Sequence, residues 1–528
     1  MILYKKINLY LLFIFIFSLL INQFSGNRGV FPIDSFAFFD TGFRVLNGEF
    51  PFKDFWVVSG PFIDYSQALF FYIFGVNWQS YLLNASLINA LFASFTFLFF
   101  REFDLNTKVN FIFTLCLSIL AYPSSGTLFV DHHSSYLSLM SVYSFCLALK
   151  KDYFIYWFLT PIFLCFAFFS KQVPSTYIFI FLLFVLFCHF FTNRKKNNLS
   201  ILIKISLSLT FLLIFFALIK ELSDINFEDF LDQYLIYPLT IGENRFTSLT
   251  LGLKNVVFDF KFIHLAFLPY FILNIFEIFF KKKSYKTIDF KIFLMFVFTY
   301  LSLIFHQLVT KNQYFIFFLI PIFTSWSYIF LQKHNFKWKT SLSYLLIFLC
   351  IFSTIKYFER FVIDRKFHEL VNVDFKNSLK AEKIDNKFIG LKWITPKSFN
   401  IDLTNNEIKK IINIKKVLNS DERKKMVITN YSFYSVLLSK SISAPSRWYP
   451  MDGTGFPIKG NKYYEKYKKF FINIIKSKKI RVIYLLDDAA KEALLDYLDI
   501  DCLKKEHNTS NLLIYTLNAK CSDLDSEL

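Results

Sequence analysis

The sequence predicts an α-helical polytopic membrane protein with about eleven transmembrane helices and a C-terminal extracytoplasmic α/β domain. Of its 528 residues 55% are hydrophobic and 75 are Phe. This composition gives more apolar surface than a soluble domain can bury. Long apolar runs recur to about residue 357 and then stop. Short β-like and amphipathic segments alternate from there to the end. The predicted domains are therefore 1–357 in the membrane, including a first outward loop at 24–62, and 358–528 outside it.

The first apolar segment, MILYKKINLYLLFIFIFSLLINQF, begins like a signal peptide because Lys5 and Lys6 precede the apolar core. No small-x-small cleavage site follows it. We therefore expect an uncleaved helix with its N-terminus in the cytoplasm.

Ten further membrane spans are expected from apolar length. They lie near 78–100, 109–122, 133–149, 153–169, 175–191, 200–219, 261–280, 288–305, 313–331 and 340–356. Alternate connections are rich in Lys and Arg, namely Arg101 and Lys108, Lys150 and Lys151, Arg194 to Lys196, Lys281 to Lys283, and Lys333, Lys337 and Lys339. The positive-inside rule puts these loops in the cytoplasm, so an odd number of spans leaves residues 358–528 on the outer face of the inner membrane.

In the C-terminal region, strands are predicted at 425–432, 479–488 and 511–518. Helices are predicted between them, at 405–418, 463–479 and 489–498. Cys502 and Cys521 lie in this region and could pair outside the cytoplasm, which their positions alone do not show.

The formal net charge of +19 suggests contact with anionic lipid rather than with nucleic acid, since basic residues gather in cytoplasmic loops and no nucleic-acid motif is present.

The stretch from Val30 to Gly75 concentrates carboxylates at the membrane surface. It holds Asp34, Asp40, Glu49, Asp54 and Asp64, with turn signals at Asn47-Gly48, Pro51 and Gly60-Pro61. Such carboxylates either interact only with solvent, or form a site for proton transfer or cation binding. In the structural alternatives Asp34 caps a helix over 35–46, Asp54 caps a turn, and Asp64 and Arg44 hold the fold.

The other outward loops carry polar residues of complementary chemistry. These are Asp131, His132, His133, Lys171, Gln172, Arg245, His306 and Lys311. Their cations could hold a phosphate. Alternatively, Asp131 to His133 form a solvated helix start or a metal pair, although adjacent His residues are poor ligand spacing on a helix. Lys171 and Lys311 could equally snorkel to lipid head groups. A divalent metal stays open as a cofactor.

Two motifs in the first loop, LNGEFPFKDFW and then GPFIDYSQALFFYIFGVNW, resemble those of the GT-C superfamily of membrane glycosyltransferases. The branch is that of protein mannosyltransferases, aminoarabinose transferases and Rgt-type lipopolysaccharide transferases, and the resemblance covers roughly residues 1–200. It implies transfer of a sugar, with inversion, from a polyprenyl-phosphate lipid donor to a hydroxyl of a glycan, lipid or protein acceptor in the cell envelope.

Further, the resemblance implies that Asp34 is the catalytic base. Relatives often have Asp-Glu where this chain has Asp34-Ser35, so Asp40 or Asp54 could compensate for the missing carboxylate. The donor phosphate would be held by Lys171, Arg245 and Lys311, with His132 or His133.

Two rival functions remain. A transporter or flippase of lipid-linked sugars would need similar polar groups, but it is disfavoured by the absence of internal repeats and by the terminal domain. An oligosaccharide ligase or polymerase would differ in using diphosphate-linked donors.

Overall fold

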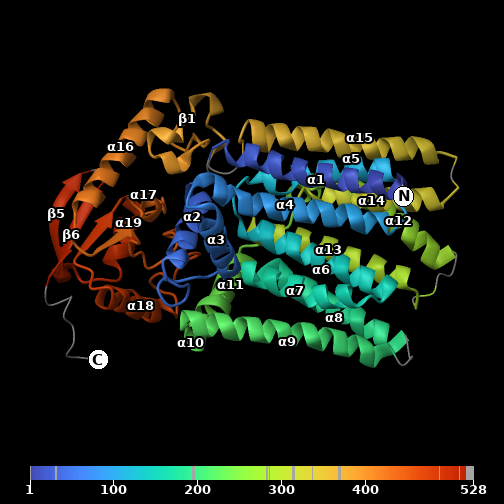
Figure 1. Cartoon of the computed structure of the whole chain (residues 1–528), viewed down its shortest axis with the longest axis horizontal. Coiled ribbons are helices and arrows are strands. Elements are labelled where there is room, and N and C mark those ends of the chain that lie inside the picture. Colours follow the sequence, from blue (N-terminus) through green and yellow to red (C-terminus); the bar gives the residue numbers. More distant parts are fainter. Residues whose placement is uncertain are drawn as a thin grey trace. The chain divides into compact units, whose positions relative to one another are not determined.

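A computed structural model of the chain describes residues 2–29, 32–192, 197–280, 284, 286–311, 316–335, 337–366, 370–486, 488–509 and 512–518 (Figure 1). The chain forms two compact units. The helical unit comprises residues 1–28, 82–218 and 248–371, and the sheet unit comprises residues 29–81, 219–247 and 372–528. Both units thus draw on segments far apart in the sequence.

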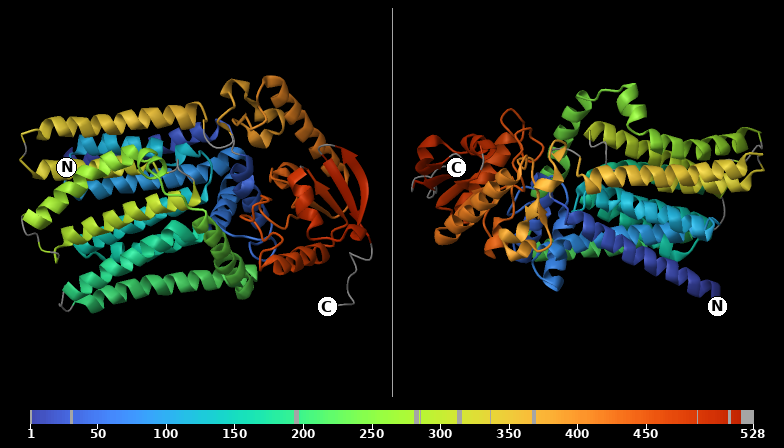
Figure 2. Two further views of the ribbon diagram at one scale, coloured as in Figure 1. Left: turned by 180° about the vertical axis from the view of Figure 1, so that it is seen from behind. Right: turned by 90° about the horizontal axis from the view of Figure 1, so that it is seen from above.

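Helices at all eleven predicted span positions are present, and most of their length lies in the helical unit. They are α1 (Ile2–Gly26), α4 (Trp78–Arg101), α5 (Thr107–Leu120), α6 (Val130–Lys151), α7 (Phe154–Ser170), α8 (Gln172–Thr192), α9 (Asn197–Ser223), α12 (Lys261–Phe280), α13 (Ile288–Thr310), α14 (Leu319–Lys333) and α15 (Lys339–Phe358). Figures 1 and 2 show helices of this unit lying side by side with their axes roughly aligned. Short helical turns follow α5, precede α12 and follow α15, namely η1 (Tyr122–Ser124), η3 (Lys254–Phe258) and η4 (Glu359–Ile363).

Among the described residues, seven helices are long and apolar enough to cross a membrane, and α7 is a shorter apolar helix. A helical multi-pass membrane protein is thereby confirmed, while the number of eleven spans stays a prediction.

The composition of α6 explains why that helix is not among the seven. All its residues from Asp131 to Leu149 are buried, and Ser134, Ser135, Ser138, Ser141 and Ser144 lower its hydropathy. Small hydroxyl residues let neighbouring helices approach closely. The helix packs against α7, α8 and α13, so it need not present apolar side chains to lipid.

The sheet unit is built on a small mixed sheet. Its strands β3 (Lys425–Ile428), β4 (Val482–Leu485), β5 (Leu503–Thr509) and β6 (Leu512–Leu517) lie in the order β3-β4-β6-β5. β3 pairs in parallel with β4, and the other pairs are antiparallel. The helices are α16 (Ile401–Ser420), α17 (Tyr434–Leu438), α18 (Tyr464–Ser477) and α19 (Asp488–Leu495), and β1 (Leu379–Lys380) pairs with β2 (Lys392–Trp393).

The three predicted strands and three predicted helices of this region are present, but β5 was missed. Its sequence, LKKEHNT, carries no apolar alternation because β5 lies at an edge of the sheet, where charged side chains protect the unpaired backbone.

The core of the sheet unit lies between one face of the sheet and helices α18 and α19. Met426, Ile428, Ile483 and Leu485 alternate along β3 and β4 and pack in one apolar cluster with residues of these helices, such as Phe471. Burial on that face fixes the register of the central strands.

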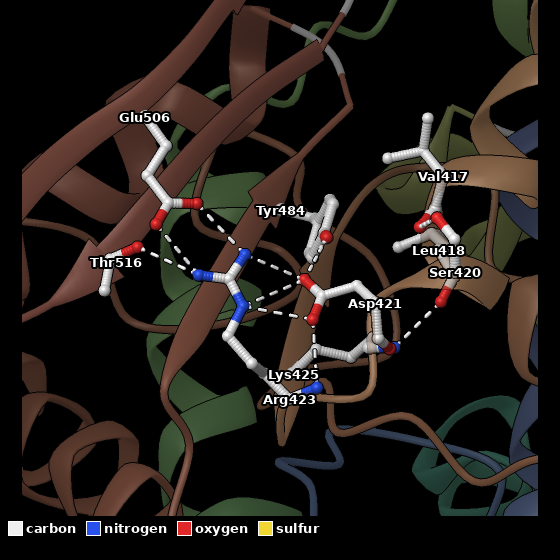
Figure 3. A network of polar contacts seen from close by, with 9 residues as sticks. All are labelled: Val417, Leu418, Ser420, Asp421, Arg423, Lys425, Tyr484, Glu506 and Thr516. Carbon is white, nitrogen blue, oxygen red and sulfur yellow. Dashed lines mark hydrogen bonds and ion pairs between the residues drawn. The ribbon is translucent and has the colours of Figure 1, made fainter.

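A polar network joins the end of α16 to the sheet (Figure 3). The guanidinium of Arg423 bonds to both oxygens of Asp421 and to both oxygens of Glu506 on β5. Tyr484 on β4 also donates its hydroxyl to Asp421. The network holds the C-terminal end of α16 beside the amino ends of the parallel strands.

The predicted first loop is folded, and most of it belongs to the sheet unit. It contains α2 (Pro32–Leu46) and α3 (Pro61–Phe74), while α10 (Phe227–Phe230), η2 (Leu231–Ile236) and α11 (Tyr237–Thr247) come from the loop after α9. The backbone N–H of Trp56 donates to the carbonyl of Pro445 at 2.8 Å. This contact ties the first loop to the C-terminal segment.

Candidate active site

Asp34, the predicted base, lies in the first turn of α2 in the sheet unit and is half-buried. A carboxylate at this position is stabilised by the positive end of the helix dipole. Its charge interacts with Tyr81, whose hydroxyl donates to the carbonyl of Ser35 at 2.7 Å. Asp34 is thus placed beside a phenol and keeps access to solvent.

Asp40 lies further along α2 and is only 5% exposed. Burial raises the pKa of its carboxyl to about 6, although Arg44 and a hydrogen bond from Ser435 act in the opposite direction. A group with this pKa can accept a proton near neutral pH. Asp40 lines a cavity of about 20 Å³ together with Ser435, room for little more than one water molecule.

Asp64 and Arg44 sit in buried ion pairs. Asp64 is bonded by the hydroxyl of Thr41 and the guanidinium of Arg447, and burial raises its pKa to about 6 despite Arg447. Arg44 Nε donates to Glu49 Oε2 at 2.7 Å. Losing one partner from such a pair leaves a buried charge, so these contacts hold α2 and α3 in place.

Asp54 stabilises the turn after α2. Its Oδ2 accepts the backbone N–H of Phe50 at 2.9 Å, and its Oδ1 lies 2.8 Å from Nζ of Lys478. Lys478 also lies 3.1 Å from Glu49 Oε1. These contacts fit the structural alternative for Asp54.

In the helical unit, three polar residues from separate parts of the sequence come together. Both oxygens of Asp131 lie 2.8 Å from Nζ of Lys171, and Nε2 of His306 lies 2.5 Å from Asp131 Oδ1. Asp131 and His306 are almost fully buried and the Lys171 side chain is 13% exposed. The Asp131 cluster, as we call these three residues, pairs charges that would be costly to bury alone.

His132 and His133 lie beside this cluster at the start of α6, and both are buried. Nδ1 of His132 lies 2.9 Å from the hydroxyl of Ser125, and Nδ1 of His133 is hydrogen-bonded to Tyr122. Within the described ranges, no group of three or more His, Cys, Asp or Glu residues could hold a metal ion. Hydrogen bonds to hydroxyl groups therefore hold the two histidines in place.

The other predicted phosphate ligands are Gln172, Arg245 and Lys311, and Gln172 directly follows Lys171 in the chain. Gln172 begins α8, where its carbonyl accepts the Thr176 hydroxyl at 2.6 Å. Lys311 is exposed at the C-terminal end of α13, and Arg245 lies on α11 in the sheet unit.

Two arginines of the helical unit were not among the predicted site residues. Arg365 is 1% exposed, and its Nη2 lies 3.5 Å from the carbonyl of Ser125. Burial, and to a smaller extent the nearby charge of Arg28, lower the pKa of Arg365 to about 9. Arg28 donates to the carbonyls of Val362 and Ile363 at 3.0 and 2.7 Å. Two neighbouring cations at such a site favour the binding of an anion.

A signal for these arginines is present in the sequence. Arg28 follows the first apolar run and Arg365 follows the last, both on the predicted outer side. Cations there oppose the positive-inside bias, which marks them for a role other than orientation.

The structure is similar to a crystal structure of ArnT from Cupriavidus metallidurans bound to undecaprenyl phosphate. The match has a TM-score of 0.52 and 12% sequence identity, and it covers 98% of this chain and 99% of that chain. The fold is ArnT-like. This confirms, at the level of fold, the resemblance to the GT-C aminoarabinose transferases.

No model of a known protein family matches the chain, and no curated protein matches it in sequence. The similarity is thus one of fold, and the role of each residue has to be argued from its own surroundings.

Proposed function

We propose that this protein is an inverting glycosyltransferase that moves a sugar from a polyprenyl-phosphate carrier to a hydroxyl of an acceptor in the cell envelope. The observation that carries the proposal is the ArnT-like fold over nearly the whole chain, since the matched ArnT was solved with undecaprenyl phosphate. The acceptor would be a glycan such as lipopolysaccharide, a lipid or a protein.

Asp34 is the proposed base. An acceptor hydroxyl must lose its proton as it attacks the anomeric carbon, and a positioned carboxylate can take that proton. Asp34 is half-buried on a helix, which combines a fixed position with access for a substrate. Asp40 is the second candidate because its pKa of about 6 suits proton transfer, but it is more enclosed.

The leaving group of this reaction is a lipid phosphate, whose negative charge needs cations. Arg365 and Arg28 supply two of them, and the burial of Arg365 strengthens its attraction for an anion. Lys171 is held by Asp131 and so contributes less net charge. The neighbouring His132 and His133 complete the proposed phosphate site.

We further propose the predicted orientation in the inner membrane, with a cytoplasmic N-terminus, eleven spans ending at residue 357, and residues 358–528 outside the cytoplasm. Cys502 is disulfide-bonded, as is typical of oxidising compartments. Cys521 lies outside the described residues.

The test is sugar transfer by membranes that contain wild-type protein, Asp34→Asn or the control Asp224→Asn, supplied with labelled polyprenyl-phosphate sugars. Asp224 is an exposed carboxylate of the same sheet unit. Loss of a general base lowers the rate by about 10²–10⁴, so Asp34→Asn should lose nearly all transfer at normal expression while the control keeps it. Full activity of Asp34→Asn would remove Asp34 from the chemistry, and no transfer by wild type with several donors would favour a transporter.

A further inference from the structure

The sheet unit contains a cavity of about 250 Å³ at the carboxyl ends of its two parallel strands. Thr429 directly follows β3 and Leu486 directly follows β4, and both line the cavity. α16 forms another wall through Ile411 and Ile414. In open α/β sheets ligands commonly bind outside the carboxyl ends of the strands.

One carboxylate in the wall is held in a fixed orientation. Oε2 of Glu407 accepts the indole N–H of Trp393 at 3.1 Å and the hydroxyl of Thr395 at 2.8 Å. Its Oε1 accepts the hydroxyl of Tyr431 at 3.3 Å. An ionised carboxylate has about four acceptor positions, so Glu407 can also accept a hydroxyl group of a ligand.

The charge of the cavity favours an anion. Lys397 and Lys410 line it with Glu407, so two positive charges face one negative charge and the sum is +1. Lys410 is half-buried and Lys397 is exposed at the rim. A partly buried ammonium group attracts an anion more strongly than an exposed one.

The remaining features suit a carbohydrate. Tyr431 and Tyr434 present rings with polar hydroxyl groups, and the ring of Tyr431 stacks on Trp393 at 6.4 Å between centroids. Such side chains offer an apolar face and a hydrogen-bonding edge together. The volume lies below the roughly 300–1,000 Å³ of sites for drug-sized molecules, so one sugar ring is the matching size.

We propose that this cavity, the β3–β4 cavity, binds one anionic sugar unit of the acceptor, in which a carboxylate or phosphate group lies against Lys397 and Lys410. This assignment to the acceptor rests on the proposed function. Glu407 accepts a sugar hydroxyl, and the ring lies against Tyr431 or Tyr434. A ligand with an anionic group and free hydroxyls can therefore bind the lysines and Glu407 at the same time.

The position of the cavity supports a role for the acceptor. Thr429, Tyr431 and Tyr434 also line the smaller cavity that contains Asp40. The two cavities therefore share one wall. Asp40, a candidate carboxylate of α2, lines the smaller cavity on the other side of this wall.

The test is ligand binding to the purified full-length protein in detergent, measured by saturation-transfer NMR without any donor. The probes are glucuronate, glucose 6-phosphate, neutral glucose and inorganic phosphate. At least one anionic sugar should bind saturably, and neutral glucose and inorganic phosphate should each bind at least tenfold more weakly. The two anionic probes distinguish a carboxylate from a phosphate.

Lys410→Ala should weaken binding of the anionic sugar by about tenfold, the effect of losing roughly 1.4 kcal/mol. Lys409→Ala is the matched control, because Lys409 is exposed on the same helix and does not line the cavity. Equal binding of neutral glucose, equal binding of inorganic phosphate, or an unchanged Lys410→Ala variant would overturn the proposal. Asp34→Asn should bind the probe normally, which separates this site from the proposed chemistry.

Discussion

Replacing Asp40 by Asn should change how the stability of the protein depends on pH. The carboxyl has a pKa of about 6 in the folded protein because it is buried, compared with 3.8 in an unperturbed state. The folded protein therefore holds this proton more tightly than the unfolded chain. The stability that this proton contributes is fully present below pH 3.8 and is lost as the pH rises through about 6.

The magnitude follows from these two pKa values, which differ by about two, equivalent to ~3 kcal/mol. Asn matches the shape of Asp and can still accept the hydrogen bond from Ser435, but it never ionises. The stability of Asp40→Asn relative to wild type should therefore rise by ~3 kcal/mol between pH 4 and pH 7.5.

The assay is thermal unfolding of both proteins in detergent at several pH values across this range. A stability difference of this size shifts the midpoint by several degrees in a domain. The Asp224→Asn variant, which removes an exposed carboxylate, controls for the loss of a negative charge as such. If the midpoint difference between Asp40→Asn and wild type is constant with pH, or falls as the pH rises, burial does not raise the pKa of the Asp40 carboxyl and the reasoning is refuted.

Two further substitutions test the helical unit. Lys171→Met should destabilise the protein by ~3–5 kcal/mol, because it leaves Asp131 buried without its ammonium partner. In the same unfolding assay Lys204→Met should cost under about 1 kcal/mol, because the carboxylate that it leaves behind, Asp152, is 45% exposed and stays solvated. Equal effects would show that Asp131 is not buried as described. Arg365→Gln should raise KM for the polyprenyl-phosphate donor about tenfold or more, the effect of losing a charged hydrogen bond, while exposed Arg360→Gln should not. An unchanged KM for Arg365→Gln would remove this residue from the phosphate site.

Hydropathy located the long apolar helices of the helical unit, because the apolar length of a span is a property of consecutive residues. Pairing between distant segments is not such a property. Asp131, Lys171 and His306 each stood out as polar groups at helix ends, but only the packing of α6 and α13 brings Asp131 and His306 within 2.5 Å. The same holds for Asp64 and Arg447, which are nearly four hundred residues apart.

The sequence predicts the apolar strands of the sheet, but it does not predict the strand at the charged edge. β4 is buried along its whole length, whereas β5 has Lys504, Lys505 and Glu506 in place of apolar residues. The β3–β4 cavity was also hidden from sequence, because its walls combine α16 with the ends of two strands that only tertiary pairing makes adjacent.

The buried, serine-rich α6 has a consequence for how the chain is made. A nascent segment enters the bilayer according to its own hydrophobicity, and a helix with five serines and Asp131 at its start partitions weakly when it is alone. Only two residues separate α6 from the strongly apolar α7, with which it packs. On the predicted topology the two helices would therefore insert together as a hairpin, with α7 synthesised before α6 is committed to the membrane.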